Sequence, residues 1–404
     1  MAEAARPTSR TLRPVKADSR DWDTTRNLYI EGDNLEVLKL LQTAYYRKVK
    51  MIYIDPPYNT GNDFVYADDF ADPMARYKEV TQQTTKSNPE TMGRYHTNWL
   101  NMMYPRLRLA ANLLRDDGVI FISIDDVEID NLKKLCNEIF GEENFVAQFI
   151  WQSRQNKDNR NITGVSIDHE YVVCYTKQFG HRVFRGTDRK TEQYKNPDND
   201  PRGPWTSANM VGLATADARP NLHYDLINPA DGRNYGCPEK GWRYDRNTMN
   251  RLIQEGRIIW PDNPDGRPRK KSFLNELSDN LPGFSSIFST GVYTNTATKE
   301  IGGLFNRYLF DFPKPVEIIK QLISQVSNTD DTILDFFSGS ATTAHAVMQL
   351  NAEDGGNRRF ILVQIPELCD EKSEAYKAGY KNICEIGKER IRRAGKKILE
   401  EHIQ

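Results

Sequence analysis

The chain has 404 residues, with 55 Lys and Arg against 56 Asp and Glu. Its net charge of −1 therefore does not by itself indicate a polyanionic partner. This length is ample for two or three domains. Five widely spaced cysteines without a Cys-x-x-Cys pair, and six histidines without ligand spacing, argue against a metal site and fit a reducing compartment. No apolar run is long enough to cross a bilayer and no signal peptide opens the chain, so we expect a cytoplasmic protein without a membrane span.

The first part of the chain predicts a flexible arm followed by a parallel α/β sheet. Residues 1–25 are polar and predict the arm. From residue 26 to 175, short apolar runs alternate with helical periodicity, which is typical of a parallel sheet with covering helices. Strands are expected near 28–30, 51–54, 119–124, 147–151 and 170–175. Helices are expected at 36–43 and 127–140.

The apolar run 51–54 ends at a turn formed by Asp55, Pro56, Pro57 and Tyr58. Two prolines cannot donate ladder hydrogen bonds, so a rigid turn must follow the strand, at the edge where open α/β sheets bind ligands. Asp55 and the Pro56 carbonyl supply two acceptors and Tyr58 a flat face, which suits a planar ring with an exocyclic amino group. Two acceptors would draw the amine toward tetrahedral geometry, and Asp55 could take the released proton. The alternative is an ordinary Asp-Pro turn.

From about residue 176 to 310, Gly, Pro, Asn, Asp and Arg become dense, with aromatic residues interleaved among them. This texture predicts an irregular inserted domain instead of another βα repeat. Its densest basic run contains Arg267, Arg269, Lys270 and Lys271. The run could contact phosphates independently of sequence, or it could be a solvated loop, and the sequence favours neither interpretation.

A second short apolar strand, 332–334, also ends at an acidic residue, Asp335. Small residues and then a helical pattern follow it, so a ligand could approach the backbone closely. There is no Gly-x-Gly-x-x-Gly and no Lys after the glycine, which argues against a dinucleotide fingerprint and against a P-loop. A plain βα turn is the alternative. Near the end of the chain, 385–400 predicts an amphipathic helix with its basic residues, Arg390 among them, on a solvated face.

The turn at Asp55, continued by Asn59, Thr60 and Gly61, together with the later turn at Asp335, resembles the amino-type DNA methyltransferases. The catalytic motif precedes the cofactor motif, which is similar to the circularly permuted β class and most like the modification subunits of type III restriction systems. The resemblance extends from about Asn27 to Lys397. It implies methyl transfer from S-adenosylmethionine to the N6 amine of an adenine flipped out of the duplex.

Three other interpretations stay open. A cytosine-N4 methyltransferase uses a similar amino group, although Asp at the first motif position is commoner in adenine enzymes of the family. A non-catalytic recognition subunit of a restriction complex is a second alternative, which the intact turn at Asp55 disfavours. Methylation of a protein glutamine or of an RNA base is a third, and the large basic and aromatic insert argues against a small peptide substrate.

The resemblance also implies roles for single residues. Asp33 is expected to contact the adenosine of the cofactor and Lys314 to help hold its methionine part. The cofactor turn itself comprises Asp335, Phe336, Phe337, Ser338, Gly339, Ser340, Ala341 and Thr342. The family commonly has Gly where Ala341 stands, and we expect a negative φ to accommodate the extra methyl. Gln364 stands where an acidic residue commonly binds the ribose hydroxyls; it can accept one hydrogen bond, and Glu367 could share the role.

The expected fold is therefore a doubly wound, mostly parallel, seven-stranded Rossmann-like sheet, circularly permuted, with an inserted irregular α+β target recognition domain. The catalytic half should span 26–175, the recognition domain 176–310, and the cofactor-binding half with a C-terminal helix 311–404. Double-stranded DNA, a second copy of the chain and a restriction endonuclease subunit are the implied partners. Aromatic residues after the catalytic turn are expected to become ordered on DNA: Tyr66, Phe70 and Tyr77.

Overall fold

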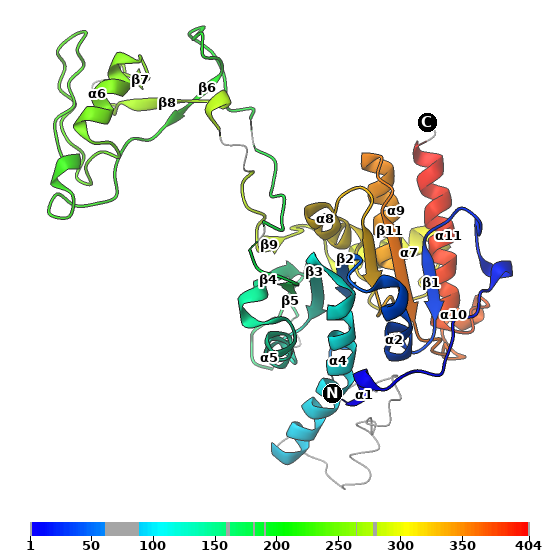
Figure 1. Ribbon diagram of the computed structural model, residues 1–404. Coiled ribbons are helices and arrows are strands. Elements are labelled where there is room, and N and C mark those ends of the chain that lie inside the picture. The colour runs from blue at the N-terminus through cyan, green and yellow to red at the C-terminus, as the bar shows by residue number, and fades with distance from the viewer. Residues whose placement is uncertain are drawn as a thin grey trace. The chain divides into compact units, whose positions relative to one another are not determined.

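The computed structural model describes residues 2–60, 89–158, 162–180, 182–189, 191–263, 265–277 and 281–402 (Figure 1). Gly61, Tyr66, Phe70 and Tyr77 therefore lie outside the described residues. The chain divides into two compact units. The first combines Met1–Arg185 with Phe284–Gln404, and the second is Gly186–Gly283.

The first unit is built on one eight-stranded sheet with the order β1-β11-β10-β2-β3-β5-β4-β9. The strands are β1 (Leu28–Glu31), β2 (Val49–Ile54), β3 (Leu114–Ile124), β4 (Phe145–Gln152), β5 (His169–Thr176), β9 (Ile287–Phe288), β10 (Thr332–Asp335) and β11 (Arg359–Gln364). All neighbours from β1 to β3 are parallel, and β9 is parallel to β4, whereas β5 is antiparallel to both β3 and β4. The sheet is thus mixed but mostly parallel. It has one strand more than the seven expected, because β9, which follows the insertion in the chain, adds a short edge strand.

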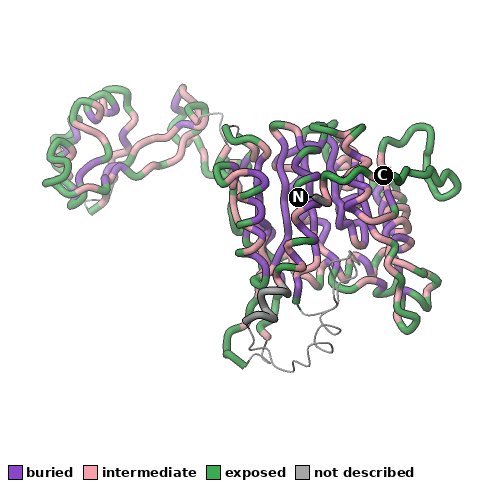
Figure 2. Tube along the Cα trace, turned by 60° about the horizontal axis from the view of Figure 1, so that its bottom comes forward, coloured by how far each residue is buried: buried purple, intermediate pink, exposed green. Residues whose placement is uncertain are grey.

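Helices cover both faces of this sheet (Figure 1). One face packs against α2 (Asn34–Tyr45), α4 (Pro89–Leu113) and α5 (Ile129–Phe140), and the other against α8 (Val316–Val326) and α9 (Thr342–Asp354). The side chains of β2 explain the two layers, because alternate residues of a strand point to opposite faces. Ile52 and Ile54 belong to the first core, and Met51 and Tyr53 to the second. Figure 2 shows the resulting buried strands between more exposed segments.

The remaining helices of the first unit lie at its periphery. They are α1 (Ala2–Ala5), α7 (Thr294–Phe305), α10 (Glu374–Lys377) and α11 (Ile383–His402), with short 3-10 helices at Lys16–Asp18 and Glu142–Asn144. The insertion was expected to span 176–310. Because α7 packs against α11 and β9 pairs with β4, residues 284–310 instead belong to the first unit. In the part of the chain that the structure describes, no helix has the length and apolar character needed to cross a membrane.

The N-terminal arm, which the sequence predicts to be flexible, contacts the first unit through side chains at two points. The carboxylate of Asp18 lies 2.6 Å from Lys388 Nζ and 3.4 Å from an Arg392 nitrogen on α11. The Lys388 ammonium holds the pKa of Asp18 below its ordinary value. Further along the arm, the hydroxyl of Thr8 donates to Glu36 on α2. Two charges on α11, which the sequence predicts to lie on a solvated face, therefore pair with the arm.

The second unit has a small core of its own around Met210, Trp242 and Met249. Its elements are the antiparallel strands β6 (Trp205–Ala208), β8 (Arg269–Phe273) and β7 (Ile258–Ile259), the helix α6 (Arg246–Gln254), and 3-10 helices at Pro220–Leu222 and Leu274–Glu276. Asp245 starts α6 by accepting hydrogen bonds from the backbone of the first helical turn. Most of the unit is irregular, as its Gly- and Pro-rich composition predicts.

Candidate functional site

The two acidic turns meet at one edge of the large sheet. Strands β2 and β10 are parallel neighbours, with Ile52 opposite Leu334. Parallel neighbours end at the same edge, so Asp55 leaves β2 beside the point where β10 ends at Asp335. Two segments that lie far apart in the chain therefore share one rim of the sheet.

Asp335 is a buried carboxyl inside this rim. Burial, reinforced by the charge of Asp55, raises the pKa of Asp335 to about 7. Two hydrogen bonds act in the opposite direction. They come from the backbone N–H of Phe337 at 3.0 Å and from the Thr343 hydroxyl at 2.5 Å. The carboxyl thereby fixes the start of the cofactor turn against the helix α9 that follows it.

The turn formed by Asp55, Pro56, Pro57 and Tyr58 is called the catalytic turn below, after its expected role. It is supported by residues of α4 and by a residue at the start of α5. Trp99 Nε1 on α4 donates to the Pro57 carbonyl oxygen at 2.8 Å. Asn59 has a positive φ of 60°, which Asn tolerates better than most residues, and its amide donates to Glu128 Oε1 at 2.5 Å. The same buried oxygen lies 2.7 Å from His96 Nδ1. Sequence reasoning missed Glu128, since it precedes its helix in a segment without a recognisable motif.

Four polar groups close a ring at the catalytic turn. Lys314 Nζ lies 3.1 Å from Asp55 Oδ1 and 3.1 Å from Glu170 Oε2. The Tyr58 hydroxyl lies 2.8 Å from the same Asp55 oxygen and 3.1 Å from the same Glu170 oxygen. The ammonium also sits over the rings of Tyr58 and Trp151, 4.9 Å and 5.9 Å from their centroids. We call these four residues the carboxylate ring: Asp55, Tyr58, Glu170 and Lys314.

The resemblance implies that Lys314 helps to hold the methionine part of the cofactor. In the structure its ammonium contacts the carboxylate of Asp55. The physical reason is burial. A buried ammonium needs compensating charge, and the two carboxylates raise the pKa of Lys314 above its ordinary value although burial alone would lower it. Lys314 therefore contacts the catalytic turn, and its expected contact with the cofactor stays a prediction.

Two acceptors of the catalytic turn receive no hydrogen bond from the described residues. Both internal donors of the carboxylate ring use Asp55 Oδ1. Among the described residues, none donates a hydrogen bond to Asp55 Oδ2 or to the Pro56 carbonyl oxygen. The turn therefore presents the pair of acceptors that an exocyclic amino group requires.

The cofactor turn leaves its backbone accessible at Gly339. This glycine has a φ of +50°, a conformation that disfavours residues with a Cβ. An added Cβ would also meet the ring of Phe310 at 3.4 Å. By contrast, the side chains of Phe336 and Phe337 are buried in the first core and pack against each other, with ring centroids 5.3 Å apart. Their side chains are thus core residues, and only their backbone lies along the turn.

Ala341 does not adopt the negative φ that we expected. Its φ is +63°, in the left-handed region, and its methyl is buried in the second core. A non-glycine residue there costs roughly 1–2 kcal/mol. The methyl is accommodated because burial of its surface offsets part of that strain.

A buried arginine holds the turn from behind. Arg390 Nη1 on α11 donates to the hydroxyls of Ser340 and Thr342, each at 2.7 Å. The prediction of a solvated face is wrong for this residue, which is fully buried, and burial lowers the pKa of Arg390 to about 10. Glu300 on α7 is its nearest acid, with 3.9 Å between Oε2 and Nη2. The hydroxyls of the turn therefore face the protein interior.

The end of β11 supplies the two candidates for the ribose contact. Gln364 Oε1 accepts a hydrogen bond from the Gly339 backbone at 2.7 Å, so this side chain shapes the cofactor turn. Glu367 is half-buried, and burial raises the pKa of Glu367. No described residue donates a hydrogen bond to its carboxylate. A half-buried acid without a partner in this part of the chain is suited to accept hydrogen bonds from a ligand.

Asp33 lies beside the cofactor turn and is already engaged. Its Oδ1 accepts from the Glu36 backbone and caps α2, and its Oδ2 lies 3.2 Å from Arg106. The next residue, Asn34, donates to the Phe336 carbonyl oxygen at 2.7 Å. This segment thus ties the start of α2 to the cofactor turn. Among the described residues, no group of three or more His, Cys, Asp or Glu could hold a metal ion.

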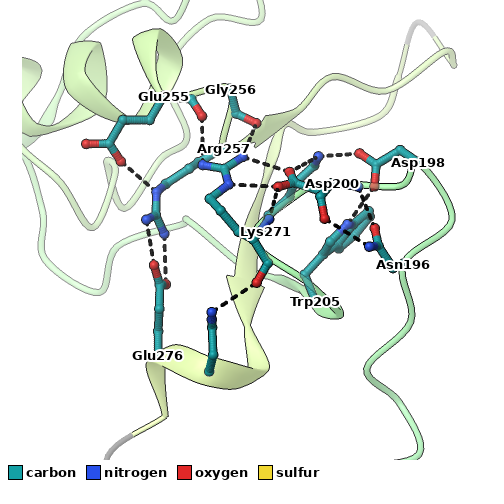
Figure 3. Close-up of polar contacts among 11 residues, drawn as sticks. Asn196, Asp198, Asp200, Trp205, Glu255, Gly256, Arg257, Lys271 and Glu276 are labelled. Carbon is teal, nitrogen blue, oxygen red and sulfur yellow. Dashed lines mark hydrogen bonds and ion pairs between the residues drawn. The ribbon is translucent and has the colours of Figure 1, made fainter.

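The second unit uses part of its basic run for its own structure. Figure 3 shows Lys271 between Asp198 and Asp200, and its ammonium lies 2.9 Å from the Asp200 carboxylate. It also lies 5.1 Å from the centroid of the Trp205 ring, and Trp205 Nε1 donates to Asp198 at 2.8 Å. Arg202 contacts the same Asp200 and holds the pKa of this acid below its ordinary range. Lys271 therefore stabilises the small sheet, and its charge is already compensated.

The rest of the run is more accessible. Arg267 and Arg269 are exposed, and Arg269 donates to the Ser207 hydroxyl at 2.5 Å. Lys270 is half-buried, with its ammonium over the Tyr244 ring, 5.3 Å from the centroid. Of the four residues expected to contact phosphates, Arg267 and Arg269 are thus the ones that present charge to solvent.

Comparison with known proteins gives consistent similarities. A family model described as DNA methylase, of the N6/N4 group, matches residues 49–392. The Mod subunit of the type III enzyme StyLTI from Salmonella typhimurium is 37% identical over 399 residues, which cover 93% of this chain and 58% of that protein. This chain thus spans less than two thirds of that relative's length.

Two further similarities are more complete in coverage. The type II methyltransferase M.KpnI from Klebsiella pneumoniae is 33% identical over 387 residues, covering 90% of this chain and 86% of that protein. A solved structure of a putative DNA modification methylase from Thermus thermophilus, complexed with S-adenosyl-L-methionine, covers 91% of this chain and 96% of that one, at 14% identity and a TM-score of 0.41. The family match and the M.KpnI alignment establish that the chain belongs to the N6/N4 DNA methylases.

Proposed function

We propose that this chain transfers a methyl group from S-adenosylmethionine to the N6 amine of an adenine flipped out of DNA, within a restriction-modification system. The observation that carries the proposal is the pairing of β2 with β10, which brings the acceptors of the catalytic turn beside the cofactor turn. Family membership supplies the reaction class, and the geometry of the turns supports its chemistry.

The residues around the cofactor turn suit the binding of S-adenosylmethionine. Gly339 presents a half-buried backbone without a Cβ, and Glu367 offers ribose hydroxyls a carboxylate to which no described residue donates. Asp33 is placed at the same edge, where one of its oxygens could also accept from the adenosine. When bound there, S-adenosylmethionine supplies an electrophilic methyl on a sulfonium cation.

The catalytic turn performs the remaining work. The base must leave the duplex, at a cost of a few kcal/mol. Asp55 Oδ2 and the Pro56 carbonyl oxygen accept the two amine hydrogens and localise the lone pair on nitrogen. Tyr58 and Lys314 fix the carboxylate through its other oxygen, so Asp55 does not have to reorganise as charge develops. Asp55, directly or through water, takes the released proton.

We further propose that Gly186–Gly283 is the target recognition domain, with Arg267 and Arg269 contacting phosphates. In this proposal the large sheet is the doubly wound, circularly permuted methyltransferase fold. The partners proposed are double-stranded DNA, a second copy of the chain and a restriction endonuclease subunit. StyLTI and its relatives carry the name of Mod subunits of type III enzymes, which motivates the last of these.

Cytosine-N4 methylation is the second candidate, because the matching family contains both activities by name. The same two acceptors would serve either amine. Asp at the first position of the turn favours adenine, on the resemblance stated above.

The test is transfer of a tritiated methyl from S-adenosylmethionine into DNA by the purified chain, followed by digestion to nucleosides. We expect label in N6-methyldeoxyadenosine, and none with Asp55→Ala. Label in N4-methyldeoxycytidine would favour the second candidate. Cofactor binding by calorimetry without any transfer would favour a non-catalytic recognition subunit.

A further inference from the structure

Glu170 is the member of the carboxylate ring that neither motif contains. It lies at the start of β5, which is antiparallel to β3, so its position at the catalytic edge results from the strand reversal. Its Oε2 receives the same two donors as Asp55 Oδ1, namely Tyr58 and Lys314. The two carboxylates therefore share one ammonium and one hydroxyl proton.

The charge of the ring follows from this sharing. Lys314 stays protonated, because Asp55 and Glu170 together raise its pKa against the effect of burial. With both acids ionised, two negative charges face one positive charge, and one net negative charge remains beside the target amine. Without the charge of Glu170, the ammonium would neutralise Asp55 and the ring would carry no net charge.

That charge matters for the reaction. The transfer forms a bond between the amine nitrogen and the methyl carbon and breaks the bond between that carbon and sulfur, whose electron pair stays on sulfur. One amine proton leaves to Asp55 or to water. Positive charge therefore builds on the amine nitrogen before the proton departs, and a fixed negative charge nearby stabilises it.

We propose that Glu170 is a positioning residue for methyl transfer: it shares Lys314 with Asp55, so that Asp55 is held in place and still presents a net negative charge to the amine. This inference rests on the proposed function. Among the described residues, the further acids whose charge acts on members of the ring are Asp125 and Asp335, and the further phenol is Tyr53. Within the described chain, the acids that contact the Lys314 ammonium are Asp55 and Glu170, so these two divide its charge.

The variant that isolates the charge is Glu170→Gln. Its amide oxygen can accept from Tyr58 and Lys314 as the carboxylate does, so the ring keeps its shape and loses only one charge. We expect kcat for DNA methylation to fall by at least about 10-fold, with KM for S-adenosylmethionine changed less than about 3-fold. Glu142→Gln, an exposed acid elsewhere in the same unit, is the matched control and should keep the kcat of the unmodified protein.

Two more variants separate charge from packing. Glu170→Asp keeps the charge with a shorter side chain and should retain kcat within about 3-fold. The double variant Glu170→Gln with Lys314→Met restores one net negative charge, because Asp55 is then the only ion of the ring. It should recover part of the kcat lost by Glu170→Gln. A purely structural role for Glu170 predicts the opposite order, since the double variant removes more contacts.

The outcomes divide clearly. The inference is overturned if Glu170→Gln keeps the kcat of the unmodified protein. It is also overturned if the kcat of the double variant is no higher than that of Glu170→Gln and the kcat of Glu170→Asp is equally low. Thermal unfolding and calorimetric cofactor binding of each variant check that the site is intact. If the unmodified protein itself transfers no methyl to DNA, the proposed function fails, and that result is visible before any variant is made.

Discussion

Trp99 Nε1 donates a hydrogen bond to the Pro57 carbonyl oxygen across 2.8 Å, and this contact joins α4 to the catalytic turn. The indole is almost fully buried, and Pro57 itself is half-buried. One side chain outside the motif thus fixes the backbone of the second proline. The two acceptors that precede it, Asp55 Oδ2 and the Pro56 carbonyl oxygen, then keep their positions.

Replacing Trp99 by Phe tests this contact. The variant keeps an aromatic ring but leaves the Pro57 carbonyl without its donor, which should cost about 1–3 kcal/mol of unfolding free energy. Because the turn loosens, we expect kcat to fall more than the affinity for S-adenosylmethionine. Denaturant unfolding and calorimetry measure the two effects. Trp22→Phe, at a more exposed position in the N-terminal arm, is the control and should change neither. An unchanged stability of Trp99→Phe would contradict the argument.

The buried carboxyl of Asp335 should make stability depend on pH. Its pKa is raised to about 7 in the folded chain, above the ordinary value of 3.8. A raised pKa means that the folded state is favoured while the group is protonated, so its contribution is full below pH 3.8 and is lost as pH rises through about 7. The unmodified protein should therefore lose up to a few kcal/mol between pH 5 and pH 8 that Asp335→Asn does not lose. Thermal unfolding of both proteins at the two pH values gives the difference, and parallel curves would count against a raised pKa.

The left-handed backbone at Ala341 predicts a contrast between two substitutions. Ala341→Gly relieves roughly 1–2 kcal/mol of strain but loses about 0.8 kcal/mol of methyl burial, so its unfolding free energy should stay within about 1 kcal/mol of the original. Ala341→Val adds a branched side chain at a positive φ in a filled core. It should lower the unfolding free energy by more than about 2 kcal/mol, because both backbone strain and overpacking oppose it. Denaturant unfolding separates the two variants. A strongly destabilised Ala341→Gly would mean that burial, and not backbone strain, dominates at this position.

What the sequence could predict was local. Both acidic turns follow short apolar runs, and each run became a strand that ends where its pattern stops. These features depend on neighbouring residues or on a motif of known spacing.

What the sequence missed depends on tertiary contacts. Glu170 reaches the site only because β5 runs antiparallel to β3, and nothing in its own neighbourhood specifies that direction. Arg390 is a different case, because a signal was present. Ile386, Arg390, Ala394 and Ile398 are spaced by four residues, so a helix places them on one face, and the structure buries all four. The charge of Arg390 suggested a solvated position, but the hydroxyls of the cofactor turn gave it partners in the interior.

Lys271 and Arg267 are close in the sequence but differ in their surroundings, so substitutions at the two positions should have different effects. The Lys271 side chain is 12% exposed and pairs with Asp198 and Asp200, whereas Arg267 is exposed. Lys271→Met leaves the two acids without their shared cation and should lower the stability of the second unit by about 1–3 kcal/mol. Arg267→Ala should leave stability unchanged and weaken DNA binding uniformly across sequences, reducing the salt dependence of the binding constant by about one unit of slope.

Thermal unfolding and DNA binding at several salt concentrations distinguish the two residues. Each variant serves as the control of the other, since both remove one positive charge from the same basic run. Equal loss of DNA affinity with no change in unfolding for Lys271→Met would show that its ammonium leaves the aspartates to contact phosphate. The predicted result, stability lost in one variant and salt slope in the other, would instead mean that the run combines a structural cation with a phosphate contact only four residues away, which its composition alone does not reveal.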